Sequence, residues 1–171
     1  MTKWMQFFML VVSVTAAGSL LASGGGEESG GRQLPPVSNA KWQAECSSCH
    51  MVYHPGLLPE RSWKKMMSGL DQHFGENASL DAPTRAEIEQ FLVLHSAEKA
   101  DNRRSHRIVQ SISASDTPLR ISETAYFKGK HDEISAATFK RNSIGSASNC
   151  IACHQGAEKG NFSESLVKIP R

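Results

Sequence analysis

The chain contains 171 residues with a formal net charge of +2; 39% of the residues are hydrophobic and 7% aromatic. This length allows one domain or two small ones, but so few aromatic residues exclude two well-filled cores built from side chains alone. The near-neutral charge hides an asymmetry, since residues 27–98 hold six basic against ten acidic residues and residues 99–171 hold twelve against seven.

The N-terminus has the layout of a secretory signal peptide. Lys3 precedes an apolar run from about Phe7 to Ala22, and a Gly- and Ser-rich segment follows. The run is shorter than the roughly 20 residues that span a bilayer, which favours cleavage over a retained membrane anchor. We therefore expect a periplasmic protein. The expected organisation is a signal peptide 1–22, a flexible spacer 23–38, an N-terminal lobe 39–98, a connector 99–117 and a C-terminal lobe 118–171.

The N-terminal lobe is predicted to be helical. A short helix is expected over residues 41–51. After a loop rich in Pro and Gly, a second helix is expected over 59–74, with Gly75 as its stop signal. A third is expected over 83–96, capped by Asp81. The inward positions of the two longer helices are Trp63, Met66, Met67, Leu70, His73, Phe74, Ile88, Phe91, Leu92 and His95.

The second half of the chain shows weaker signals. Residues 99–117 are charged and serine-rich, as in a connector. A basic cluster in this segment is most simply a solvated face. It could instead be a patch that orients a redox partner, or a nucleic-acid patch, although export argues against nucleic acid. The cluster consists of Arg103, Arg104 and Arg107. Further along, the pattern predicts a short strand over 119–121, a short helix over 132–141 and a helix around Cys150.

Two copies of one pentapeptide use all four cysteines of the chain. They are Cys46-Ser47-Ser48-Cys49-His50 and Cys150-Ile151-Ala152-Cys153-His154. Cys-x-x-Cys-His is the attachment signature of c-type haem. The two thiols form thioethers with one porphyrin, and the adjacent imidazole binds the iron. The sequence therefore predicts two covalent haem c groups, with His50 and His154 as proximal ligands. Two large flat cofactors would also complete the thin cores.

Other uses of paired cysteines explain less. Zinc ribbons separate their pairs by about 15 to 20 residues, whereas Cys49 and Cys150 lie far apart. A thioredoxin-type pair would need a βαβ context, which neither copy has. Disulfides suit an exported protein but leave the adjacent histidines unexplained.

For the first haem, His73 is the predicted distal ligand. It lies on an apolar helical stripe, where an imidazole without a partner would be costly to bury. Met66 and Met67 share that stripe and are alternative sulfur ligands of the first iron, but methionines at helical spacing more often pack in a core. His54 is a less favoured alternative that would reach an iron or bind a propionate. His95 also faces inward but stands at a helix end, where capping is an ordinary role.

For the second haem, His131 is the predicted distal ligand. It is the remaining histidine of the C-terminal lobe and stands at an expected helix start. His106 lies among arginines and is expected to be exposed. Two bis-histidine irons would have no open coordination site and low reduction potentials, as suits electron transfer.

The chain resembles the diheme cytochrome c family of the DHC type. The likeness rests on four segments: CSSCHMVYHPGLLP (46–59), SWKKMMSGLDQHFGE (62–76), KHDEIS (130–135) and NCIACHQGAEKGNF (149–162). The predicted helices give a mainly α fold, with an N-terminal lobe similar to class I cytochrome c. The family resemblance implies two small haem-wrapped lobes. It also implies bis-histidine haems, a membrane b-type cytochrome as electron donor and the sphaeroides haem protein, a small oxygen-binding monohaem protein, as acceptor.

The sequence thus predicts an exported electron carrier rather than an enzyme. We expect a monomer that does not bind nucleic acid. The alternatives are a small diheme oxidoreductase or peroxidase, which would need an open iron site and an acid–base group beside it, and a haem-based gas sensor.

Overall fold

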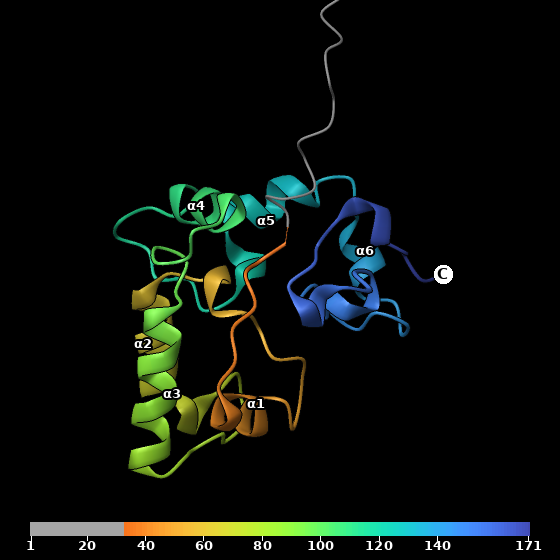
Figure 1. The fold of residues 1–171 in the computed structure, drawn as a ribbon. Coiled ribbons are helices and arrows are strands. Elements are labelled where there is room, and N and C mark those ends of the chain that lie inside the picture. Colours follow the sequence, from red (N-terminus) through yellow and green to blue (C-terminus); the bar gives the residue numbers. More distant parts are fainter. Residues whose placement is uncertain (1–32) are drawn as a thin grey trace, which may run out of the picture.

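The computed structural model describes residues 33–171, whose regular elements are short helices joined by turns and irregular loops (Figure 1). The predicted signal peptide and the spacer up to residue 32 lie outside the described residues. The prediction of a mainly α fold is confirmed, since the only β pairing in the described part is three isolated bridges. No helix in residues 33–171 has the length and apolar character needed to cross a membrane. The α-helices are α1 Ala40–Cys46, α2 Glu60–Ser68, α3 Ala82–Leu94, α4 Arg103–Gln110, α5 Ala125–Lys130 and α6 Ala136–Phe139.

Helices α2 and α3 lie side by side with α1 at one end, and they enclose the first hydrophobic core (Figure 1). Helix α3 begins where the sequence predicts, because the Asp81 side chain accepts a hydrogen bond from the Thr84 backbone N–H. Burying this apolar set supplies the main stabilisation of this part of the chain. The core consists of Trp42, Leu58, Trp63, Met67, Ile88, Phe91 and Leu92.

The second helix is shorter than predicted. It ends at Ser68, because Gly69 closes it with an N–H donated to the Met66 carbonyl. A 3-10 turn follows over Leu70–Gln72, and Phe74 takes a left-handed backbone with φ of 55°. The expectation of a continuous helix to residue 74 is therefore wrong, and the last three positions of the apolar stripe, Leu70, His73 and Phe74, lie outside the helix.

A second hydrophobic core crosses the predicted connector. Helix α4 lies within residues 99–117, and its Ile108 is fully buried against Leu34 and Leu57. The Leu34 backbone N–H also donates to the Gly160 carbonyl at 2.9 Å. Residues from the spacer, the N-terminal lobe and the connector thus share one apolar cluster, with C-terminal side chains packed around it.

The C-terminal elements differ from those predicted. The expected strand over 119–121 is wrong, since the chain forms a 3-10 turn over Ile121–Glu123. Thr124 then caps the unpredicted α5, and Ser135 caps the four-residue α6, which is all that forms of the helix expected over 132–141. A 3-10 turn over Cys150–Ala152 replaces the expected haem helix. At the first motif, α1 ends at Cys46 rather than at Met51. Helices α5 and α6 each start at a hydroxyl cap, and both are too short to show a helical periodicity in the sequence.

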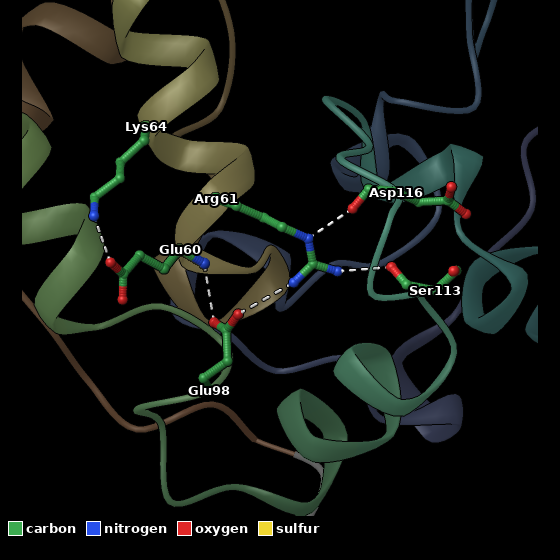
Figure 2. A network of polar contacts seen from close by, with 6 residues as sticks. All are labelled: Glu60, Arg61, Lys64, Glu98, Ser113 and Asp116. Carbon is green, nitrogen blue, oxygen red and sulfur yellow. Dashed lines mark hydrogen bonds and ion pairs between the residues drawn. The ribbon is translucent and has the colours of Figure 1, made fainter.

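Arg61 ties α2 to the loop that follows α4 (Figure 2). Its Nε donates to the Asp116 carbonyl at 2.6 Å and its Nη2 to the Ser113 carbonyl at 3.0 Å. The same guanidinium forms an ion pair with Glu98 at 3.7 Å, and Glu98 also accepts the Glu60 backbone N–H. One planar side chain with several donors thereby links α2 to the loop after α4 and to Glu98.

Candidate haem sites

The first Cys-x-x-Cys-His motif starts at the last residue of α1 and continues into an exposed turn. His50 Nδ1 donates to the Met51 carbonyl at 2.7 Å. This hydrogen bond orients the ring and places the proton on Nδ1. The lone pair on Nε2 is then available to bind a metal ion.

His73 lies opposite His50, with the two ring centres 6.1 Å apart and the ring planes 29° apart. Two imidazoles that bind one metal ion from opposite sides, through bonds of about 2.0 Å, place their ring centres about 6 Å apart. The end of α2 at Ser68 makes this approach possible, because the following 3-10 turn carries His73 out of the helix. The structure therefore brings together the two histidines that the sequence predicts as ligands of the first haem.

The second motif has an equivalent pair. His131 and His154 have ring centres 5.9 Å apart, with the ring planes 80° apart. The sequence suggested that His131 stands at the start of a helix. In the structure it is instead the C-cap of α5. Its Nδ1 donates to the Phe127 carbonyl at 2.9 Å, and its ring stacks on Phe127 at 4.0 Å. Both contacts hold the ring in one orientation, and the hydrogen bond uses Nδ1 rather than Nε2.

A cavity of about 640 Å³ surrounds this second pair and is lined by Cys150 and Cys153. This volume is within the range of sites that hold cofactor-sized ligands. In addition, His154 Nδ1 is buried and has no hydrogen-bond partner among the described residues. A buried polar nitrogen of this kind is costly unless a bound group completes its site. The residues of this site therefore fit a covalently attached haem.

The remaining histidines are not brought to either pair. His54 is buried, its Nδ1 accepts the Gly56 N–H at 3.0 Å, and its Nε2 donates to the Pro35 carbonyl at 2.7 Å. His95 is half-buried with its ring against Phe91, and His106 is exposed on α4. The methionines named as packing residues are in the first core, with Met67 buried and Met66 partly buried against it.

The family model of dihaem cytochrome c matches residues 42–162, which include both motifs and both histidine pairs. The chain belongs to the dihaem cytochrome c family. It therefore carries two covalently bound haem c groups. No curated protein sequence matches the chain.

Solved structures of dihaem cytochromes agree with this assignment. The chain is 46% identical to the diheme cytochrome c from Rhodobacter sphaeroides, covering 74% of this chain and 98% of that one, with a TM-score of 0.65. It is 41% identical to the diheme cytochrome type c from Shewanella baltica OS155, covering 79% of this chain and 95% of that one, with a TM-score of 0.64.

In this dihaem cytochrome the bound haems supply a one-electron couple, and the polypeptide supplies attachment, orientation and electrostatics. Burial, and then the partner imidazole, lower the pKa of His73 and of His154. The rings are thus neutral at neutral pH, which is the state that binds metals. Before haem attachment, burial raises the pKa of the Cys46 and Cys150 thiols to about 11, unlike the activated cysteines of redox enzymes.

The basic cluster of α4 lies at the second candidate haem site, which the sequence did not predict. All three arginines of α4 line the second cavity. Arg104 stacks over the Phe162 ring at 5.2 Å and donates to the Tyr126 hydroxyl at 3.2 Å. Guanidinium groups on a haem pocket suit carboxylates such as propionates. Arg103 and Arg107 are four residues apart, a spacing that puts both on one face of a helix. The sequence does not show that this face lies against the second haem motif, which is more than 40 positions away.

Replacing His54 with alanine is expected to destabilise the fold without changing either haem. The Gly56 N–H and the Pro35 carbonyl would lose their partner inside the protein, at a cost of about 2–4 kcal/mol. Denaturant unfolding measures this loss, and electron paramagnetic resonance (EPR) should still show two low-spin haems. His106→Ala is the control on an exposed histidine. A high-spin signal in His54→Ala would instead identify His54 as an iron ligand.

Proposed function

We propose that this dihaem cytochrome carries electrons outside the cytoplasm. It would accept them from a membrane b-type cytochrome and pass them to a small monohaem protein of the sphaeroides haem protein type. Its irons would be ligated by His50 with His73 and by His154 with His131, and the two haems would act as relay and charge store.

The observation that carries this proposal is the ring spacing of 6.1 Å in one pair and 5.9 Å in the other. An iron held between two imidazoles has no free position for a substrate, so its chemistry is outer-sphere electron transfer. Two nitrogen ligands stabilise ferric iron more than His/Met ligation does. The resulting low reduction potential suits an electron donor. Membership of a cytochrome c family, which is typically exported, supports the location outside the cytoplasm.

The test mixes the fully reduced protein with a ferric monohaem acceptor in a stopped-flow instrument. We expect oxidation in two resolvable electron steps, with a second-order rate constant of about 10⁵–10⁷ M⁻¹s⁻¹. A ferric acceptor that stays oxidised, together with catalytic consumption of peroxide by the reduced protein, would instead support the peroxidase alternative. Reversible binding of carbon monoxide at neutral pH would support the gas-sensor alternative.

A further inference from the structure

Tyr53 lies between the two candidate haem sites. It follows the first motif by three residues, and its ring centre is 5.1 Å from that of His50. Its hydroxyl donates to the Ser148 carbonyl at 2.6 Å, across 95 positions of sequence. This single side chain therefore touches the proximal histidine of one site and the backbone that enters the other motif.

The Ser148 carbonyl leads directly into the second motif. It accepts the Cys150 backbone N–H at 3.0 Å as well as the Tyr53 hydroxyl. The Cys150 sulfur lies 3.6 Å from the same oxygen. A continuous series of contacts thus runs from the His50 ring through Tyr53 and Ser148 to the sulfur that is attached to the second haem.

The position of Tyr53 is well supported by packing. Its ring is half-buried and packs against the first hydrophobic core. A second contact joins the same two parts of the chain, because the Arg120 guanidinium lies 3.6 Å from the centre of the Phe74 ring, beside His73. The two attachment motifs are therefore held in one arrangement by side chains that are far apart in sequence.

We propose that Tyr53 is a positioning residue that couples the two haem sites, and that its hydroxyl sets how fast an electron passes between them. This inference rests on the proposed electron-carrier function. In the step, one iron goes from ferrous to ferric while the other goes from ferric to ferrous. No bond breaks and no proton moves, since Tyr53 keeps its proton in the hydrogen bond to Ser148.

The test compares Tyr53→Phe with Ser111→Ala in the holoprotein. Each substitution removes the hydroxyl of a half-buried side chain that donates to a backbone carbonyl. The Ser111 hydroxyl, however, donates to the Ile108 carbonyl at the end of α4 and does not link the two sites. Exchange NMR of the haem methyl signals in half-reduced samples measures the intramolecular rate. We expect Tyr53→Phe to slow the exchange several-fold, because it removes the hydrogen bond that links the first site to the Ser148 carbonyl. Ser111→Ala should exchange at the wild-type rate.

An unchanged rate in Tyr53→Phe would overturn the proposal, as would an equal slowing in Ser111→Ala. Tyr53→Leu removes the ring as well and should slow exchange further while EPR still shows two low-spin haems. Reduction by a small inorganic complex starts the experiment, so no protein partner is needed. Failure of the stopped-flow reaction with a monohaem acceptor would therefore leave this measurement intact, and the two proposals can fail separately.

Discussion

Replacement of His131 by alanine is expected to convert one of the two haems from low spin to high spin. The His131 ring faces His154 across 5.9 Å, and its orientation is set by Phe127. Removing it leaves one axial position without a protein ligand, so that iron should bind carbon monoxide. EPR gives the spin state, and carbon monoxide difference spectra count the open sites.

The matching variant His73→Ala should open the other iron, and the double variant should open both. His95→Ala is the control, because its half-buried ring contacts Phe91 rather than either histidine pair. If His131→Ala kept two low-spin haems with no carbon monoxide binding, another side chain would be the distal ligand of the second site.

The variant Cys150→Ser/Cys153→Ser is expected to carry one haem and to lose ordered structure over residues 118–171. Without its cofactor the second site holds a space of about 640 Å³. Water that enters this space cannot replace the apolar contacts between a haem and the residues that line it, so the region would lose much of its stabilisation. Few apolar side chains of this region are buried in compensation, the largest being Ile144.

Intact mass counts the haems, and hydrogen exchange of backbone amides measures the ordered structure. The comparison is Cys46→Ser/Cys49→Ser, which removes the first haem instead. The N-terminal part should keep most of its protection in that variant, because α2 and α3 enclose a core of seven buried residues. Equal losses of protection around the two sites would contradict the expectation.

The helices could be predicted where a cap and a periodic apolar face agree. Helix α3 satisfies both conditions through Asp81 and the buried Ile88. Helix α2 did not follow the same logic, because its apolar stripe continues past Gly69, where the backbone leaves the helix. The 3-10 turns have no periodic signal at all, and α5 depends on one hydroxyl at Thr124. Local hydrogen bonds decided those boundaries.

The role of His54 shows the same limit for the site. In sequence it follows the first motif and precedes a proline, which suits a ligand as well as a structural residue. In the fold both ring nitrogens are hydrogen-bonded to backbone groups, from Gly56 and Pro35. The environment of a histidine depends on chain segments that approach it from elsewhere, so its neighbours in sequence do not reveal it.

The sequence by itself determined that the chain carries two haem groups. It also predicted the cysteines that attach them and the proximal histidines, because thioether attachment and proximal ligation occur within five consecutive residues. The sequence predicted His73 and His131 as the partners of these histidines, but it left His54 as an alternative, and the tertiary structure showed the ring centres of the two pairs 6.1 Å and 5.9 Å apart. Only the tertiary structure showed that three arginines of α4 line the second cavity and that Tyr53 reaches Ser148. These contacts join segments separated by tens of residues, and their geometry is set by how the helices pack and where each one ends.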